Sequence, residues 1–249
     1  MKTGILGIIV LFFVSISAIF FAGPPAVDEE TLIIGTNAEY RPFSYIDDGE
    51  IVGFDIDIIS EVCRRLGRAM LIKDMPFDAL IPAGAVGKVD VIAAGITYTA
   101  ERAKKVLFTE PYLSGDDLVV IIADGDDVIS SLDDLEGLTV VVNEGYTADL
   151  YLSKTVDFPL MRLPSPADAF MALKSGRADV FFTAQSTASA FFSHDSNSGF
   201  TMSSFNAPGD DYALVVSKKS SYLLHDINSV LYDMETDGTI DKLKEKWSL

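Results

Sequence analysis

One arginine stands in a setting that could bind an anion. Arg102 lies between Gly95 and Tyr112, on a short polar turn that separates two apolar runs. Its side chain carries five donors in a rigid planar fork, so it can grip a carboxylate through two parallel hydrogen bonds and keeps its charge when water is excluded. Because most surface arginines are only solvated charges, this interpretation depends on what surrounds Arg102.

A second candidate anion site follows a predicted strand at 139–142. Gly145, Tyr146 and Thr147 stand at the start of a predicted helix, whose first backbone amides have no partner within the helix. Such amides favour a negatively charged group. The alternative is that these residues only form a turn and a helix cap. We predict that Arg102 and this helix start hold one carboxylate together.

Alternating strands and helices predict the elements that carry these residues. The first half of the chain has predicted strands at 32–36, 70–74 and 89–93, and predicted helices at 55–66 and 77–84. Strands that alternate with helices form a largely parallel sheet, whose ligand crevice opens at the carboxyl ends of the strands. Polar segments 37–40 and 94–97 follow the first and third strands, so we expect them at the crevice.

The alternation starts again after Ser114 and predicts a second sheet. Further strands are expected at 117–122, 139–142, 179–183 and 212–217, and further helices at 147–152, 167–174, 221–236 and 240–247. The sequence shows no internal repeat. A chain of 249 residues with 49% hydrophobic content is long enough for two compact lobes.

Charge and the N-terminal segment limit the partners and the location. The formal net charge of −18 disfavours nucleic acid and anionic lipid surfaces as partners. Residues 1–22 begin with a charged start and continue as an apolar run, which predicts a signal peptide or an N-terminal anchor, followed by a linker at 23–30. We therefore expect a periplasmic or other extracytoplasmic protein, with membrane contact only through an uncleaved leader.

Metal binding and catalysis are not favoured by the sequence. The two histidines, His194 and His225, do not lie at ligand spacing, and the one cysteine, Cys63, falls on the apolar stripe of a predicted helix. No P-loop and no local Ser-His-Asp arrangement stands out. We expect no metal, no cofactor and no catalytic residue, and we expect Cys63 to pack in the core.

Seven segments, taken in order, resemble the periplasmic amino-acid-binding proteins of ABC importers. They are GTNAEYRPFSY from Gly35, GFDIDIISEV from Gly53, FDALIPAG from Phe77, GITYTAERAKKVLFTEPY from Gly95, LEGLTVVVNEGYT from Leu135, SGRADV from Ser175 and DGTIDKLKEKW from Asp237. The resemblance implies a two-lobe α/β fold of the type II periplasmic-binding-protein class, with a mainly parallel sheet in each lobe. It also implies that residues 31–114 and 210–249 form lobe 1 and residues 115–209 form lobe 2, with two crossover strands as the hinge.

The same resemblance implies the residues that line the ligand site. Tyr40 and Phe77 would sandwich the ligand's side chain, and Thr97 with the backbone of Ala94 and Gly95 would hydrogen-bond the ligand. The complete set of expected ligand-binding positions is Asn37, Tyr40, Phe77, Ala94, Gly95, Thr97, Arg102, Gly145, Tyr146, Thr147 and Ala184.

Two of these positions depart from the family's pattern. Asn37 stands where receptors for cationic amino acids often carry an acid, which favours a polar, uncharged ligand. Ala184 stands where the family usually has an aspartate that pairs with the ligand's ammonium group. Because an unpaired buried ammonium costs several kcal/mol, another acid replaces it, the amine stays hydrated, or the ligand has no amine. The candidate substitutes are Gln185, Glu144 and Glu39.

Together these observations predict an exported, monomeric receptor for a small carboxylate-bearing solute, first of all an amino acid. It would deliver this ligand to the transmembrane subunits of an ABC permease. One alternative is an exported dehydratase that acts on a cyclic carboxylic acid, with Glu39 or Glu144 as general acid or base. The other is a tethered sensor module that retains its leader.

Overall fold

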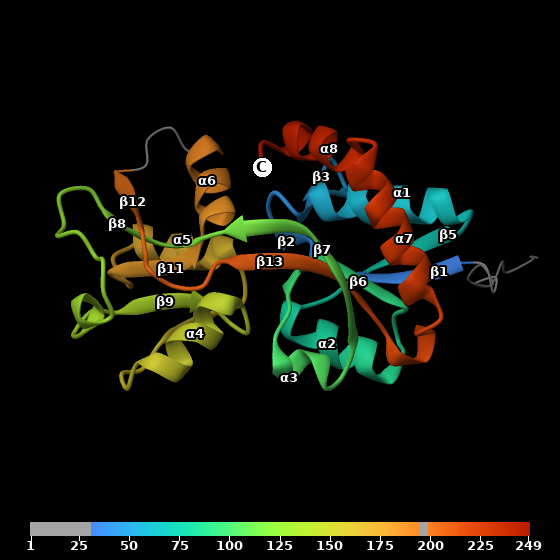
Figure 1. Cartoon of the computed structure of the whole chain (residues 1–249). Coiled ribbons are helices and arrows are strands. Elements are labelled where there is room, and N and C mark those ends of the chain that lie inside the picture. Colours follow the sequence, from blue (N-terminus) through green and yellow to red (C-terminus); the bar gives the residue numbers. More distant parts are fainter. Residues whose placement is uncertain (1–30, 195–198) are drawn as a thin grey trace, which may run out of the picture.

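The computed structural model describes residues 31–194 and 199–249. The predicted leader and linker therefore lie outside the described residues. Two bodies stand side by side, each a five-stranded sheet flanked by helices, and two strands run between them (Figure 1). We call the body that contains the first strand the first lobe and the other body the second lobe.

The first lobe contains a sheet with the strand order β5-β1-β6-β13-β7. These strands are β1 (Thr31–Thr36), β5 (Ala69–Asp74), β6 (Val91–Thr97), β7 (Leu107–Asp116) and β13 (Asp210–Val216). β1 is parallel to β5 and β6, as expected, but β13 is antiparallel to both β6 and β7. The sheet is mixed rather than mainly parallel because β7 leaves toward the second lobe and β13 returns beside it.

Helices cover both faces of this sheet. They are α1 (Phe54–Leu66), α2 (Phe77–Val86), α3 (Ala100–Ala103), α7 (Leu223–Thr236) and α8 (Thr239–Trp247), with a 3-10 turn η2 (Lys218–Ser220). A small sheet of β2 (Glu39–Tyr40), β3 (Ser44–Asp47) and β4 (Glu50–Val52) precedes α1. Helix α1 buries Cys63 in the core, as predicted, and burial raises the pKa of that thiol to about 11. Gly67 ends α1 in the left-handed conformation that glycine adopts without strain.

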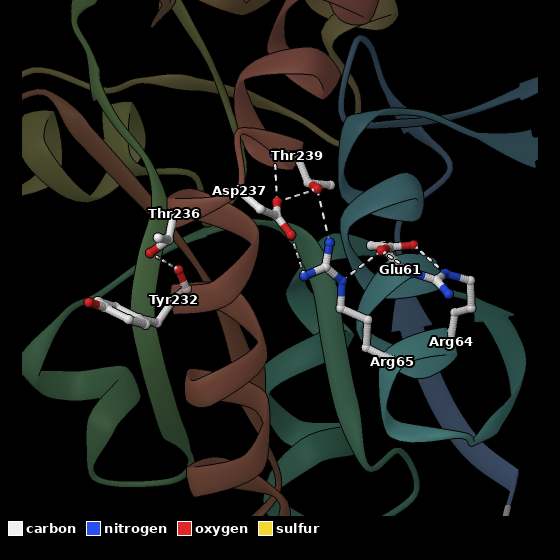
Figure 2. Close-up of polar contacts among 7 residues, drawn as sticks. All are labelled: Glu61, Arg64, Arg65, Tyr232, Thr236, Asp237 and Thr239. Carbon is white, nitrogen blue, oxygen red and sulfur yellow. Dashed lines mark hydrogen bonds and ion pairs between the residues drawn. The ribbon is translucent and has the colours of Figure 1, made fainter.

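A polar cluster fastens the C-terminal helices to α1. Arg65 donates from Nη1 to Asp237 at 2.8 Å and from Nη2 to the Thr239 hydroxyl at 2.9 Å, at the junction of α7 and α8 (Figure 2). Glu61 accepts from Arg65 and also from both donors of the Arg64 fork at 2.7 Å. These cations hold the pKa of Glu61 near 2. The last segments of the chain are therefore attached to the first lobe.

The second lobe contains a sheet with the strand order β10-β9-β11-β8-β12, which is also mixed rather than mainly parallel, because β8 is antiparallel to both β11 and β12. Its strands are β8 (Leu118–Ala123), β9 (Val140–Asn143), β10 (Met161–Leu163), β11 (Val180–Ala184) and β12 (Phe200–Ser204), and its helices are α4 (Thr147–Thr155), α5 (Pro166–Lys174) and α6 (Gln185–His194), with a 3-10 turn η1 (Asp133–Leu135). Alternate residues of one strand enter different cores, because side chains alternate between the faces of a sheet. Phe182 packs in one apolar cluster and Phe181 in the other.

The two lobes meet at a narrow hinge. β7 ends at Asp116, and β8 begins at Leu118, while β12 ends at Ser204 and β13 begins at Asp210. Asp116 and Asp210 are cross-strand partners in the antiparallel pair of β7 and β13. Two carboxylates therefore stand opposite each other where both connections cross between the lobes.

Candidate functional site

Arg102 joins the two lobes directly. It lies on α3, whose start is capped by the Thr99 hydroxyl accepting from the Arg102 amide at 3.2 Å. The side chain is 8% exposed, and its guanidinium donates from Nη1 to the Thr97 carbonyl at 2.7 Å and from Nη2 to the Gly145 carbonyl at 2.9 Å. Burial lowers the pKa of Arg102, and the charge of Asp210 opposes that shift. The fork thus reaches the loop that precedes α4.

The first turn of α4 faces the same place. Its N-cap is Tyr146, and Thr147 and Ala148 are its first two residues. Backbone amides in this position have no partner within the helix and carry the positive end of the helix dipole. The arrangement therefore brings a guanidinium from the first lobe and helix-start donors from the second lobe together at Gly145, which is the juxtaposition that the sequence predicts.

Tyr146 of the second lobe packs against the two aromatic rings expected to hold the ligand. Its ring centroid lies 4.2 Å from that of Phe77 and 5.1 Å from that of Tyr40. Its hydroxyl donates to Oδ1 of Asn37 at 3.5 Å, and Asn37 donates in turn to the Met75 carbonyl at 3.3 Å. The two lobes are thus in contact here, and Tyr146 packs against both rings of the expected ligand slot, which we call the aromatic slot.

Gly95 supports the floor of that slot. Its φ is +58°, and a Cβ at this position would lie 2.6 Å from Cε1 of Tyr40. Its amide donates to the buried carboxylate of Asp55, which also accepts from the Tyr112 hydroxyl at 2.8 Å. Burial raises the pKa of Asp55 to about 7. The Gly95 amide is therefore already engaged within the protein.

Gly95 and Thr97 belong to β6 itself, although the sequence suggested that the strand ends at residue 93. Ala94 is fully buried in the same strand. The Thr97 hydroxyl donates to Oδ1 of Asp210 at 2.7 Å, and its carbonyl accepts from Arg102. Tyr98, by contrast, is 59% exposed and packs on Phe108, away from the slot.

Asp210 is the main residue of this site that sequence reasoning missed. It is 4% exposed and accepts from the hydroxyls of Thr97 in the first lobe and Thr147 in the second. Burial raises its pKa to about 6, while the two threonines and Arg102 oppose this shift. The sequence feature that could have identified Asp210 is its position at the start of an apolar strand, within the predicted hinge.

Ala184 ends β11 and is 5% exposed. It lines a residual cavity of about 10 Å³ with Asp210, Tyr40, Tyr146 and Thr147. The three substitutes suggested by sequence do not reach this buried place, since Glu39, Glu144 and Gln185 are all exposed. The buried acid beside Ala184 is Asp210 instead.

An acidic groove opens next to the aromatic slot. Asn37 and Phe77 line it together with several carboxylates, and its volume is about 540 Å³. The acids are Glu39, Asp74, Asp78, Glu144 and Asp168. Five carboxylates around one groove favour a cationic group, because nearby negative charge stabilises a cation.

Within residues 31–194 and 199–249, no group of three or more His, Cys, Asp or Glu residues is placed to hold a metal ion. The side chain of His194 lies outside the described residues. The helices of the described ranges are all too short or too polar to cross a membrane. The functional site that the described residues support is the one around Arg102.

Comparisons with known proteins agree with this architecture. The sequence profile of the bacterial extracellular solute-binding proteins, family 3, matches residues 32–249. The arginine-binding extracellular protein ArtP of Bacillus subtilis is 33% identical over 88% of this chain and 86% of its own length. The lysine/arginine/ornithine-binding periplasmic protein of Escherichia coli is 30% identical over 99% of this chain and 97% of its own.

A solved relative extends the comparison to three dimensions. An ancestral arginine-binding protein, solved once with arginine and once with glutamine bound, superposes with a TM-score of 0.82. It is 38% identical, and the match covers 88% of this chain and 98% of that one. The two-lobe α/β fold expected from the sequence is confirmed by this match.

Proposed function

Because this chain belongs to the bacterial extracellular solute-binding proteins of family 3, we propose that it binds an amino acid with a basic side chain, arginine first of all, between its lobes. We further propose that it is an exported receptor that delivers this ligand to an ABC permease. The hinge lies where 31–114 and 210–249 meet 115–209. The relatives are binding proteins, so the chain is a receptor rather than a dehydratase.

The observation that carries the proposal is the bridge from Arg102 to the start of α4. The fork now donates to two neutral carbonyls, those of Thr97 and Gly145. A ligand carboxylate at this place would accept charge-assisted hydrogen bonds, which are roughly twice as strong as bonds between neutral groups. The same carboxylate would reach the open amides of α4. A ligand that touches both lobes stabilises the closed form relative to the open one.

A basic side chain suits the region beyond the aromatic slot. A guanidinium can stack on the faces of Tyr40 and Phe77 and reach the five carboxylates of the acidic groove. The names of the relatives also favour basic amino acids. These observations weigh against the polar, uncharged preference that Asn37 suggested. Glutamine remains the second candidate, because the ancestral relative was also solved with glutamine.

The test is titration calorimetry of the full exported chain with L-arginine, L-lysine, L-histidine, L-glutamine and agmatine, which is arginine without its carboxylate. We expect arginine to bind at least about 100-fold more tightly than agmatine, because agmatine has no carboxylate to pair with the buried guanidinium of Arg102. The Arg102→Met variant should lose a similar factor for arginine. Arg64→Met removes an exposed arginine of α1 and serves as the matched control.

Two results would contradict the proposal. If Arg102→Met bound arginine as tightly as the wild type, the carboxylate would lie elsewhere. If glutamine bound more tightly than all three basic amino acids, the argument from the acidic groove would be wrong, while the receptor function would stand. Melting curves of each variant separate a loss of binding from a loss of folding.

A further inference from the structure

Each strand that crosses the hinge carries a carboxylate that is bonded to both lobes. Asp210 begins β13 and accepts from the hydroxyls of Thr97 in the first lobe and Thr147 in the second. Asp116 ends β7 and also has a donor in each lobe. Because hydrogen bonds to carboxylates are among the stronger ones in proteins, these contacts favour one arrangement of the lobes over others.

The partners of Asp116 come from opposite sides of the hinge. Tyr212 of β13 donates its hydroxyl proton to Oδ2 of Asp116 at 2.7 Å. Ser186, in the first turn of α6, donates its hydroxyl to the same oxygen at 2.5 Å and its amide to Oδ1 at 2.9 Å. Tyr212 is 1% exposed and belongs to the core of the first lobe. The carboxylate of Asp116 therefore connects that core to the start of α6.

The hydroxyl of Tyr212 also meets the aromatic slot. It lies 3.0 Å from the hydroxyl of Tyr40, which belongs to one of the two rings of that slot. Burial raises the pKa of both tyrosines well above the ordinary value, so both hydroxyls keep their protons. Each hydroxyl has one proton, and that of Tyr212 goes to Asp116, so Tyr40 donates to Tyr212. We call Tyr40, Tyr212, Asp116 and Ser186 the hinge chain.

The ring of Tyr40 is tightly packed on several sides. Its centroid lies 4.9 Å from that of Phe43 and 5.1 Å from that of Tyr146 in the second lobe. On another side its Cε1 lies so close to Gly95 that a Cβ there would be only 2.6 Å away. A ligand in the aromatic slot would contact this ring, and a shift of the ring would move the hydroxyl that starts the hinge chain.

Open space separates the lobes on the α6 side. A groove of about 650 Å³ is lined by Ser186 and Ser189 of α6 and, across from them, by Tyr45 and Trp247 of the first lobe. Helices α6 and α8 stand on opposite sides of this groove (Figure 1). Because side chains do not fill the groove, the place of α6 relative to the first lobe depends on its contacts at the hinge.

We propose that Tyr212 is a positioning residue that couples the aromatic slot to the angle between the lobes through the hinge chain. This inference rests on the proposed function only for the identity of the ligand. The chain holds the start of α6 in place and favours the arrangement in which Tyr146 packs on Tyr40. Without the Tyr212 hydroxyl, Asp116 loses its first-lobe donor and Tyr40 loses its acceptor. More widely separated arrangements of the lobes would then gain population.

The test measures the distance between the lobes without any ligand. Spin labels are attached to the full exported chain at Ser189→Cys on α6 and Glu245→Cys on α8, which are both exposed positions. The native Cys63 is buried and is therefore protected from the label. Distances between the two labels are then compared by pulsed electron paramagnetic resonance in the wild-type background and in each variant.

Tyr212→Phe removes the central hydroxyl and keeps the ring. We expect it to lengthen the mean distance between the labels by more than about 2 Å. Tyr112→Phe is the matched control, because Tyr112 is also buried and donates to a buried carboxylate, that of Asp55, at 2.8 Å, but within the first lobe. Both variants should melt at a lower temperature than the wild type, whereas Tyr112→Phe should keep the distance within about 1 Å.

Ser186→Ala tests the hinge chain from the second lobe, and it keeps the test decisive if Tyr212→Phe does not fold. It should also lengthen the distance between the labels. Its control is Ser153→Ala, because Ser153 donates to another aspartate of the second lobe, Asp149, at 3.0 Å. In calorimetry with L-arginine, Tyr212→Phe should bind about 10-fold more weakly than the wild type, and Ser153→Ala should differ by less than about 3-fold.

The outcomes separate the hinge chain from the proposed function. If Tyr212→Phe leaves the distance between the labels unchanged, whatever its melting temperature, Tyr212 only stabilises the fold and the proposal is refuted. Equal lengthening in Tyr112→Phe refutes it as well. A longer distance with unchanged arginine affinity would refute the coupling to the slot. If the wild type does not bind arginine, the proposed function fails, while the distances still decide whether the hinge chain sets the angle between the lobes.

Discussion

The pH dependence of stability should reveal the buried Asp55. Its carboxylate lies under the aromatic slot, where it accepts hydrogen bonds from the amide of Gly95 and the hydroxyl of Tyr112. Burial raises its pKa to about 7, so the folded protein keeps this proton between about pH 4 and pH 7 while the unfolded chain releases it. The stabilisation from Asp55 is therefore complete below about pH 4 and is lost as the pH rises through about 7.

The size of the effect follows from the two pKa values. The difference between the ordinary 3.8 and about 7 corresponds to at most about 4 kcal/mol, at about 1.4 kcal/mol for each pKa unit. The Asp55→Asn variant is a neutral copy of the protonated side chain, and its amide group can still accept from Gly95. Relative to the wild type, the variant should gain about this much free energy of unfolding between pH 4 and pH 8.

Urea unfolding followed by the fluorescence of Trp247 measures this difference. Trp247 is the only tryptophan of the chain and packs against the core of the first lobe, where Asp55 also lies. The exposed Asp124→Asn variant of the second lobe serves as the control for loss of one charge. Asp210, whose pKa is also raised, is present in both proteins and cancels from the comparison. Stability curves that run parallel from pH 4 to pH 8 would refute the reasoning.

Two further predictions concern the cleft. Gly95→Ala should lower both the melting temperature and the affinity for arginine, because the new Cβ would lie 2.6 Å from Tyr40 at a positive φ. Gly67→Ala is the control, because Gly67 has a similar φ and open space around it, and this change should lower the free energy of unfolding by only about 1 kcal/mol. The Tyr146→Ala variant without ligand should have a larger radius of gyration in X-ray scattering than the wild type. The reason is that two aromatic contacts, together worth about 2 kcal/mol, would no longer hold the lobes together. An unchanged radius of gyration would contradict this.

The order of the main elements was predictable because each has a strong local signal. The buried stripe of α1 and its terminal Gly67 lie where the sequence suggested. The hairpins around Tyr40 and the strands β10 and β12 were missed, since they are short and their pairing depends on distant partners. Helix α6 was also missed, because its run of small and polar residues carries little apolar periodicity.

Only part of the site was predictable from the sequence. Arg102 and the start of α4 are marked by local sequence, and the structure brings them together at Gly145. Asp210 could not be assigned, because its environment is formed by Thr97, Thr147 and Asp116, which come from three distant parts of the chain. The substitutes that the sequence suggested for Ala184 lie next to it in the sequence or follow predicted strands, whereas Asp210 lies on the strand that returns from the second lobe.

The contacts between the lobes define what a ligand must contribute in order to bind. Tyr146 already fills the aromatic slot, so apolar contact with Tyr40 and Phe77 gives a ligand little advantage over this side chain. The guanidinium of Arg102 is different, because within residues 31–194 and 199–249 its side chain donates to the neutral carbonyls of Thr97 and Gly145. A ligand carboxylate can replace these neutral contacts of Arg102 with charge-assisted ones. Under the proposed function, selectivity for a carboxylate-bearing ligand follows from these differential contacts, and the acidic groove beyond the slot would favour a basic side chain.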